Sequence, residues 1–290
     1  MVKNLILPVR SGVDLEVEVF GEELDKTVVL VAGINAPAQF WPTEFCRKLA
    51  DFGYKVVRYS NRDVGLSTTF KSAYPFGELV SDLIALLDYL ALKPVKLIGH
   101  SMGGFITQVV ACDYPEYLSS AVIISASCTI EGEQLQRLGV PERDMAQVRE
   151  LMNHTPSGNF EQDLPGWLEH WALLNGSHSV DRELATGYTR ALYVGGRRAK
   201  ESTFNQLYAY TTVPKTLVDQ VRMLKIPCLI MHGTEDPLMN VANGYALNKL
   251  ISNSQIATLT GAGHMFMNNQ LWSEILENIV EFYKKIKQTN

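Results

Sequence analysis

The chain has 290 residues, 46% of them hydrophobic, and a formal net charge of −5 at pH 7. This length and composition suit one large α/β domain that carries an insertion, and they argue against a disordered chain. The negative charge and the absence of long basic runs argue against nucleic acid as the main partner. The short basic cluster Arg197, Arg198 and Lys200 is interpreted as a solvated face.

Residues 1–21 alternate between apolar and polar side chains, which predicts two short strands around an Arg-Ser-Gly turn. No positive segment precedes a long apolar stretch, so no signal peptide is expected, and no window reaches the ~18 apolar residues of a membrane span. The four cysteines are far apart in apolar neighbourhoods and are interpreted as buried free thiols: Cys46, Cys112, Cys128 and Cys228. We therefore expect a cytoplasmic protein.

Apolar runs then alternate with helical patterns, which is typical of a largely parallel sheet with helices on both faces. Strands are predicted at 27–33, 54–60, 95–100, 120–127, 226–233 and 254–261. Helices are predicted near 42–52, 76–91, 102–114, 239–251 and 270–287. The second of these helices carries one apolar stripe, formed by Leu79, Leu83, Leu86, Leu87 and Leu90. Together with the two N-terminal strands, the pattern predicts a mostly parallel eight-stranded sheet.

The alternation of strands and helices stops after about residue 128 and resumes near residue 226. The segment between is helical, polar and aromatic, with no clear strand. We predict a core formed by residues 1–128 and 224–290, with residues 129–223 inserted as a helical cap, or lid, over the strand ends.

A glycine-flanked serine follows the strand 95–100 in the stretch "LIGHSMGGF". Ser101 stands between Gly99 and Gly103, just before a predicted helix, which is the context of a nucleophile elbow. In such an elbow the serine has a strained backbone, and larger residues at the two glycine positions would clash. A helix N-cap serine is the alternative, but an N-cap does not require the glycines. We therefore predict that Ser101 is a catalytic nucleophile.

A serine nucleophile needs a base, and the base needs a carboxylate that holds its tautomer. His264 ends a Gly-rich loop beyond the last strand and is better placed for the first role than the other histidines. Asp236 follows the strand 226–233 and is our candidate for the carboxylate. Glu235 should face the other way, while Glu131 is a weaker candidate from the loop after strand 120–127.

Attack by a serine on a carbonyl group also needs donors for the oxygen that becomes negative during the reaction. The backbone N–H of Met102, at the start of the helix after Ser101, is expected to supply one donor. The N–H of Ile34, in the loop "VAGINAPAQFWP", is expected to supply the second. The nearby Arg62 and Asp63 are interpreted as scaffolding, with Asp63 holding its own turn.

Taken together, these segments resemble the α/β-hydrolase family of serine esterases with a helical cap, through "GHSMGG", "GTEDPL" and "GAGH". The chain is most similar to the branch typified by aclacinomycin methylesterase, through "VAGINAPAQFWPTEF" and "VVRYSNRDVGLST". The motifs cover about residues 2–128 and 222–285, whereas the cap matches only loosely. Ala32-Gly33 also replaces the family's common His-Gly dipeptide. The resemblance implies the α/β-hydrolase fold and hydrolysis by a serine nucleophile, but it does not identify which ester is the substrate. No cofactor or metal is expected.

The expected reaction is hydrolysis of a carboxylic ester through an acyl-enzyme, with a small-molecule ester as the partner. The predicted pocket lies between the strand ends and the lid and is lined by Ile34, Met102, Cys128, Trp167, Trp171 and Tyr188. Residues 33–41, 99–104 and 262–268 contain no lysine or arginine, which favours a neutral, fairly hydrophobic ester. A small alcohol such as methanol is implied by the resemblance alone.

Several alternatives stay open. Amide, lactone, thioester or carbon–carbon hydrolysis would use the same triad. A receptor of this fold with slow or no turnover would keep the pocket for ligand sensing. A serine at the elbow argues against epoxide hydrolases and haloalkane dehalogenases, which carry aspartate there. The sequence does not specify whether the protein is a monomer or an oligomer.

Overall fold

The computed structural model describes residues 2–142, 145–152, 156–194 and 200–288. Among these residues one eight-stranded sheet forms, in the order β1-β2-β4-β3-β5-β6-β7-β8. The strands are β1 (Val2–Arg10), β2 (Val13–Phe20), β3 (Thr27–Val31), β4 (Lys55–Tyr59), β5 (Val95–His100), β6 (Leu118–Ile124), β7 (Cys228–Gly233) and β8 (Ser254–Leu259). The basic cluster at Arg197 and Arg198 lies outside the described residues.

The first two strands form an antiparallel hairpin, and β2 also pairs antiparallel with β4. Every other pairing in the sheet is parallel, including that of β5 with β6, where Leu97 lies opposite Ala121. The prediction of a mostly parallel eight-stranded sheet is therefore confirmed. Parallel strands finish at one edge of the sheet, where a site can form.

The helices connect these strands and also occupy the segment between β6 and β7. The α-helices are α1 (Thr43–Asp51), α2 (Gly77–Tyr89), α3 (Met102–Asp113), α4 (Gly132–Arg137), α5 (Met145–Met152), α6 (Phe160–Leu174), α7 (Arg182–Ala191), α8 (Lys200–Thr211), α9 (Leu217–Gln220), α10 (Ala242–Leu250) and α11 (Asn269–Gln288). Short 3₁₀ helices cover Ala38–Phe40, Pro115–Tyr117 and Val221–Met223.

The two faces of the sheet are buried in two hydrophobic clusters. In β6, Ala121 and Ile123 belong to the cluster that includes side chains of α2 and α3. Val122 and Ile124 belong to the cluster that includes side chains of α1 and α11. Successive side chains of a strand point to opposite faces, so continuous apolar runs are the expected sequence of strands covered on both sides.

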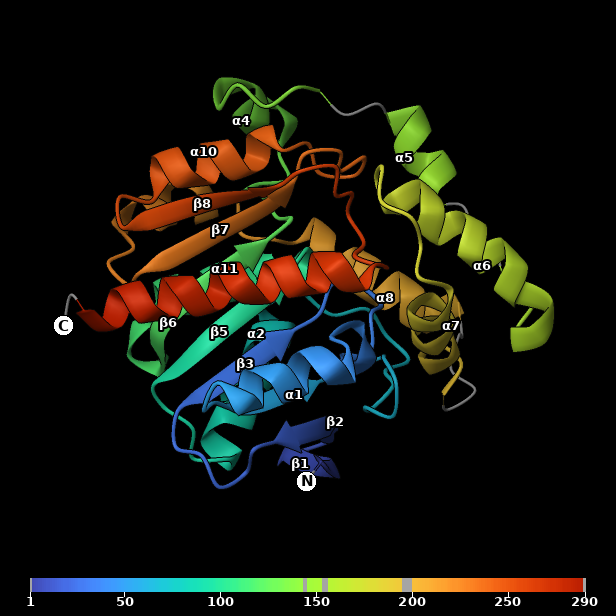
Figure 1. Ribbon diagram of the computed structural model, residues 1–290, viewed down its shortest axis with the longest axis horizontal. Coiled ribbons are helices and arrows are strands. Elements are labelled where there is room, and N and C mark those ends of the chain that lie inside the picture. The colour runs from blue at the N-terminus through green and yellow to red at the C-terminus, as the bar shows by residue number, and fades with distance from the viewer. Residues whose placement is uncertain (1, 143–144, 153–155, 195–199, 289–290) are drawn as a thin grey trace.

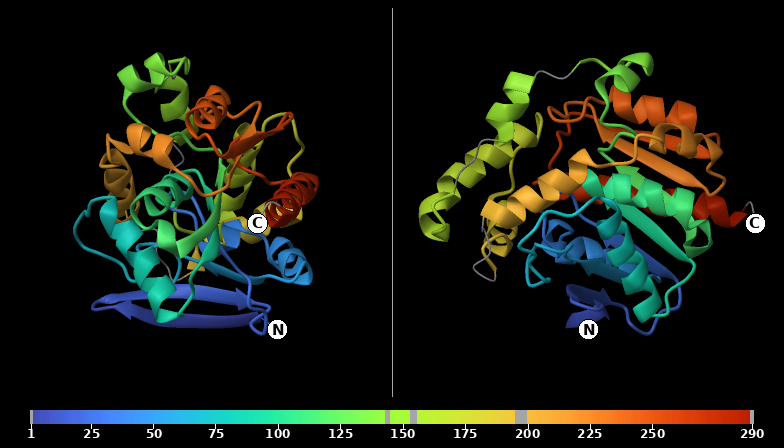
Figure 2. Two further views of the ribbon diagram at one scale, coloured as in Figure 1. Left: turned by 90° about the vertical axis from the view of Figure 1, so that its left-hand side faces the viewer. Right: turned by 180° about the vertical axis from the view of Figure 1, so that it is seen from behind.

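Helices α4 to α9 all lie in the chain between β6 and β7. Figures 1 and 2 show α5, α6 and α7 beyond the edge at which the parallel strands finish. Backbone hydrogen bonds join this segment to the core: Ser177 N donates to Gly261 O at 2.9 Å, and Met265 N donates to Leu174 O at 2.9 Å.

Several element boundaries differ from the prediction by a few residues, and local contacts explain some of these differences. Strand β6 ends at Ile124 rather than at residue 127, because Ser125 has a left-handed backbone (φ 48°) that turns the chain out of the sheet. Helix α10 begins at Ala242 rather than near 239. The N–H groups of Leu238 and Met239 instead donate to Asp236 Oδ1 in a turn after β7. Leu90 is the C-cap of α2 and not part of its helical stripe.

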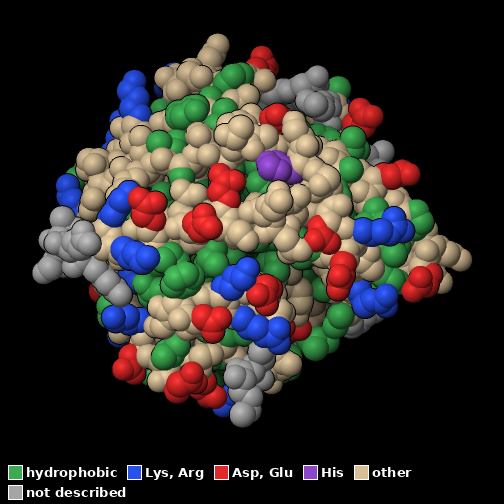
Figure 3. Space-filling view, viewed as in Figure 1, with side chains coloured by type: hydrophobic (Ala, Val, Ile, Leu, Met, Phe, Trp, Pro, Cys, Tyr) green, Lys and Arg blue, Asp and Glu red, His purple; other side chains and the backbone are tan. Residues whose placement is uncertain are grey.

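Surface charge, helix hydrophobicity and the state of the cysteines can be compared with the expectations from the sequence. On the face shown in Figure 3, acidic and basic side chains are interspersed. No helix among the described residues is long and apolar enough to cross a bilayer. All four cysteines are free, as expected, and three are buried, but Cys112 is only half-buried.

Candidate active site

Ser101 lies at the sharp turn between β5 and α3. Its backbone is left-handed, with φ 54° and ψ −120°, and its N–H donates to Ile124 O at 2.9 Å. A non-glycine residue in this region carries strain and persists only where its surroundings hold it. The turn presents the partly exposed Ser101 at the carboxyl edge of the sheet, immediately before the N-terminus of α3.

The two flanking glycines are required by close approach of the backbone. A Cβ atom on Gly99 would overlap the carbonyl of Gly103, and one on Gly103 would overlap the carbonyls of Val31 and Ala32. The clash predicted from the sequence is therefore confirmed. Glycine at both positions lets α3 pack directly against β3 and β5.

The structure brings Ser101, His264 and Asp236 into one hydrogen-bonded chain. His264 Nε2 lies 3.0 Å from Ser101 Oγ, and His264 Nδ1 lies 2.8 Å from Asp236 Oδ2. Because a carboxylate can only accept, Nδ1 carries the proton and Nε2 is left with a lone pair that faces the serine hydroxyl. The arrangement can therefore remove a proton from Ser101.

The environment of Asp236 keeps its carboxyl ionised. Burial alone would raise its pKa, but the charge and hydrogen bond of His264, the nearby His232 and the Met239 N–H together hold the pKa below its usual value. The Asp236 Oδ1 atom accepts from Leu238 N at 2.9 Å and from Met239 N at 2.7 Å. These donors leave Oδ2 to face His264.

His232, near the end of β7, is a buried neighbour of the same carboxylate. Its Nε2 donates to Met239 O at 2.6 Å and lies 3.6 Å from Asp236 Oδ2. Burial lowers its pKa, so the ring stays neutral. The bond to Met239 O holds the turn that donates to Asp236.

His100 does not contact the hydroxyl of Ser101. Its Nε2 donates to His264 O at 2.9 Å, and its ring stacks on Phe40 with centroids 4.4 Å apart. Burial, followed by the neighbouring His264 charge, lowers the pKa of His100 to about 3. This histidine is neutral at physiological pH and links the serine turn to the His264 loop.

The two alternative acids lie elsewhere. Glu235 accepts a hydrogen bond from Ser177 Oγ, and Glu131 Oε1 lies 3.2 Å from Lys215 Nζ. Neither carboxylate takes part in the hydrogen bonds of His264.

The loop that carries Ile34 packs against the serine turn. A Cβ on Gly33 would lie 3.2 Å from Ser101 Cβ and 3.3 Å from His100 Nδ1, so the loop packs tightly against the elbow. A turn closes it, with Ala36 N donating to Gly33 O at 3.3 Å. Met102 is the first residue of α3, where the N–H groups lack partners within the helix.

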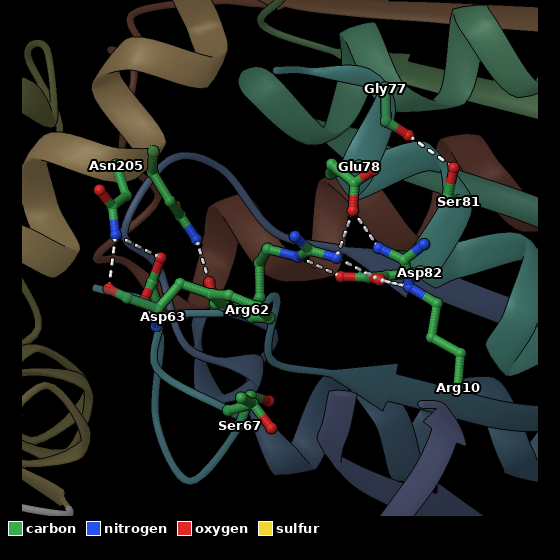
Figure 4. A network of polar contacts seen from close by, with 12 residues as sticks. Arg10, Arg62, Asp63, Ser67, Gly77, Glu78, Ser81, Asp82 and Asn205 are labelled. Carbon is green, nitrogen blue, oxygen red and sulfur yellow. Dashed lines mark hydrogen bonds and ion pairs between the residues drawn. The ribbon is translucent and has the colours of Figure 1, made fainter. Parts of the chain in front are cut away.

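Arg62 and Asp63 form part of a structural network, seen in Figure 4. The Arg62 guanidinium pairs with both oxygens of Asp82, at 2.5 and 2.6 Å. Asp63 Oδ1 accepts from Phe70 N at 2.7 Å and Oδ2 accepts from Asn205 Nδ2 at 3.1 Å. Both side chains are engaged within the loop and its neighbours.

The six expected pocket residues fall into two groups. Ile34, Met102 and Cys128 pack in the cluster that includes α3, whereas Trp167, Trp171 and Tyr188 pack in the cluster that includes α11. Burial raises the pKa of the Cys128 thiol to about 12, so it is neutral.

The aromatic group is tied together within the segment between β6 and β7. The two indoles stack with centroids 4.8 Å apart, Trp167 Nε1 donates to Tyr193 OH, and Trp171 Nε1 donates to Thr189 Oγ1. Tyr188 also lines a groove of about 620 Å³ between α1, α7 and α11. Neither the triad nor Ile34, Met102 or Cys128 lines that groove.

Two buried residues near the site were missed from the sequence. His232 lacks the loop position that drew attention to His264, and Gln206 lies on α8, in the segment between β6 and β7. The Asn35 N–H donates to Gln206 Oε1 at 2.5 Å. No short motif marks either residue. The contacts of Gln206 join distant parts of the chain, and those of His232 are made within the turn after β7.

Comparison with known proteins places the chain in a family. The chain is 28% identical over 273 residues to rhodomycin D methylesterase DauP of Streptomyces sp. (strain C5), covering 88% of this chain and 90% of that protein. It is 28% identical over 212 residues to 3-oxoadipate enol-lactonase 2 of Acinetobacter baylyi, covering 71% and 70% of the two chains. The esterase EaEST of Exiguobacterium antarcticum superposes with a TM-score of 0.77 at 20% identity, over 97% of this chain and 100% of that one.

The methylesterase match confirms the resemblance to the methylesterase branch, and the structural match supports the fold. Residues 26–268 match the family described as the alpha/beta hydrolase fold, which is most of the chain. The protein therefore belongs to the alpha/beta hydrolase fold family.

Proposed function

We propose that the protein is a serine esterase that cleaves a neutral, fairly hydrophobic carboxylic ester through an acyl-enzyme. The chain is a carboxylic-ester hydrolase, the class to which its methylesterase relative belongs by name. The hydrogen-bonded chain from Ser101 Oγ through His264 to Asp236, at 3.0 and 2.8 Å, is the observation that carries the proposal.

In the acylation step, Ser101 Oγ attacks the ester carbonyl carbon while His264 Nε2 takes the hydroxyl proton. Asp236 holds the imidazolium that results. The carbonyl oxygen becomes negative and accepts hydrogen bonds from the N–H groups of Ile34 and Met102. His264 then gives its proton to the alcohol oxygen as the C–O bond breaks, which leaves Ser101 acylated.

In the deacylation step, water replaces the alcohol. His264 removes a proton from the water, whose oxygen attacks the acyl carbon. The same two N–H groups stabilise the second tetrahedral intermediate. When it collapses, His264 returns the proton to Ser101 Oγ and the carboxylic acid leaves.

For the substrate site, we propose that residues 129–223 act as a cap and that the ester lies between this cap and the strand ends. The leaving alcohol must lie on the side of His264, because that residue protonates it. Leu174, one turn after Trp171 on α6, lies beside the His264 loop, because its carbonyl oxygen accepts a hydrogen bond from Met265 N. Ile34, Met102 and Cys128 would contact the acyl side, and the Trp167, Trp171 and Tyr188 group would form the aromatic wall.

Lactone hydrolysis is a second candidate, since the match with an enol-lactonase covers more than two thirds of each of the two chains. A lactone is a cyclic ester and would use the same steps, with the alcohol remaining attached to the acyl group. For an open ester, comparison with the named methylesterase favours methanol as the alcohol.

Active-site labelling with a fluorophosphonate tests the proposal. The probe should add its mass to the peptide that contains Ser101, and Ser101→Ala should abolish both labelling and turnover of a p-nitrophenyl ester. Labelling confined to another serine would refute the assignment. Steady turnover supports an esterase, whereas one slow burst without turnover would instead indicate a ligand receptor.

A further inference from the structure

We propose that Gln206 of helix α8 is a positioning residue that sets the geometry of the Ile34 loop. This inference rests on the proposed function, because it concerns the donor that Ile34 supplies. Gln206 is fully buried although it carries an uncharged polar side chain. Its Oε1 accepts from Asn35 N at 2.5 Å and its Nε2 donates to Arg62 O at 2.7 Å.

The two contacts determine which way the amide points. A carbonyl oxygen only accepts, so the NH₂ end of Gln206 must face Arg62 O. The oxygen end then faces the N–H of Asn35. Glutamate could not donate to Arg62 O, and methionine could neither donate to it nor accept well from Asn35, although each has a similar length.

Arg62 provides a rigid anchor for this bridge. Its side chain is 2% exposed, it pairs with Asp82, and its guanidinium lies 4.5 Å and 4.7 Å from the ring centroids of Phe70 and Tyr74. Figure 4 shows Arg62 directed towards Asp82 and Glu78. Because Arg62 is held on several sides, its backbone carbonyl gives Gln206 a fixed partner.

The other end of the bridge reaches the residue after Ile34. Asn35 has a left-handed backbone, with φ 53°, a region that residues with side chains adopt uncommonly. Such a conformation persists when neighbouring groups hold it. Fixing the Asn35 N–H fixes the plane of the peptide group between Ile34 and Asn35, and so restricts rotation of the Ile34 backbone. Gln206 thereby limits the direction of the Ile34 N–H.

The adjacent Asn205 offers a matched control. It is 2% exposed, lies on the same helix, and its Nδ2 donates to Asp63 Oδ2 at 3.1 Å and to Phe70 O at 2.8 Å. Within the described residues it makes no hydrogen bond to residues 33–36. Asn205→Leu therefore removes two buried hydrogen bonds between α8 and the core, as Gln206→Met does, without touching the Ile34 loop.

The experiment compares Gln206→Met with Asn205→Leu in the full chain. For Gln206→Met, kcat on a p-nitrophenyl ester should fall about 10- to 100-fold with KM changed by less than about threefold, because a misplaced donor weakens mainly the transition state. A trifluoromethyl ketone, which forms an anionic adduct with a serine, should bind more weakly by a similar factor. Asn205→Leu should lower Tm by a similar amount but keep kcat within about threefold.

Equal loss of kcat in both variants would mean that Gln206 only attaches α8 to the core, and this result would overturn the inference. Unchanged kcat in Gln206→Met would also overturn it, whereas activity that survives Ser101→Ala would overturn the proposed function itself. If Gln206→Met does not fold, Gln206→Asn keeps the amide but is one methylene too short to span both partners. It should then show the same selective loss of kcat, of about fivefold or more.

Discussion

Asp236 Oδ2 lies 2.8 Å from His264 Nδ1, while the other oxygen of the same carboxylate accepts two backbone N–H groups of its own turn. The turn therefore aims the carboxylate at the imidazole before any substrate is present. Because its pKa is held below the usual value, Asp236 stays ionised in the range where the enzyme would work.

Replacing Asp236 by Asn should lower kcat on the order of 10⁴-fold while leaving the fold intact, because the amide allows the wrong histidine tautomer. Steady-state kinetics on a p-nitrophenyl ester and a circular dichroism spectrum test this. Glu131→Gln and Glu235→Gln remove carboxylates that do not bond to His264 and should cost far less. A crippling effect of Glu131→Gln would show that the acid is assigned wrongly.

The elbow gives a second prediction, with a matched pair of glycines. Gly103→Ala places a methyl group against the carbonyls of Val31 and Ala32, so the free energy of unfolding should fall by on the order of 3 kcal/mol, and turnover should be lost. Nothing lies within 4 Å of a Cβ built on Gly132, so Gly132→Ala should keep both stability and turnover. Urea unfolding followed by fluorescence measures the difference, and a fully stable Gly103→Ala would contradict the packing described here.

The sequence predicts those parts of the fold and of the site that depend on contacts between residues close together in the chain. The elbow and the order Ser101, Asp236, His264 depend on local turns after strands, which glycine spacing and apolar runs reveal. Gln206 depends on side-chain contacts with segments distant in the chain, which no local pattern encodes. His232 contacts its own turn at Asp236 and Met239, but a histidine inside an apolar strand carries no motif that would predict this role. The end of β6 was misjudged because Ser125 turns out of the sheet within an apolar run that reads as continuous strand.

The aromatic residues of the segment between β6 and β7 show the same limit. Their abundance predicted a pocket, but an aromatic residue buried against another aromatic has the same sequence signature as one that faces a ligand. In the structure Trp171 donates to Thr189 Oγ1 and contacts Tyr188, with ring centroids 5.3 Å apart. These contacts hold helices α6 and α7 together, whereas a role in binding stays a prediction.

A third prediction concerns acid stability. Burial lowers the pKa of His100 from the usual 6.5 to about 3. Between these two pH values, His100 binds a proton in the unfolded chain but stays neutral in the folded chain. Stability is therefore present above pH 6.5 and is lost as pH falls towards 3. Between pH 7.5 and 5 this histidine should remove about 2 kcal/mol from the free energy of unfolding.

His100→Gln removes that titration and keeps a side chain able to donate to His264 O. Urea unfolding at pH 7.5, 6 and 5 should show a shallower loss of stability for His100→Gln than for the wild type. His232, whose pKa is also lowered, remains in both proteins and contributes equally to each. Parallel curves for the two proteins would mean that His100 is not held neutral by burial.

The final prediction concerns the substrate. Residues 33–41, 99–104 and 262–268 provide no lysine or arginine to pair with a charged acyl group, so neutral, hydrophobic esters should have the highest kcat/KM. If the stacked Trp167 and Trp171 form the wall of the pocket, replacing either by Ala should raise KM for bulky esters more than for acetate esters. Leu173→Ala, at a 60% exposed position of the same helix, should change neither. Equal effects on both esters would leave the indoles a role in the cap alone, and a preference for charged acyl groups would refute the apolar pocket.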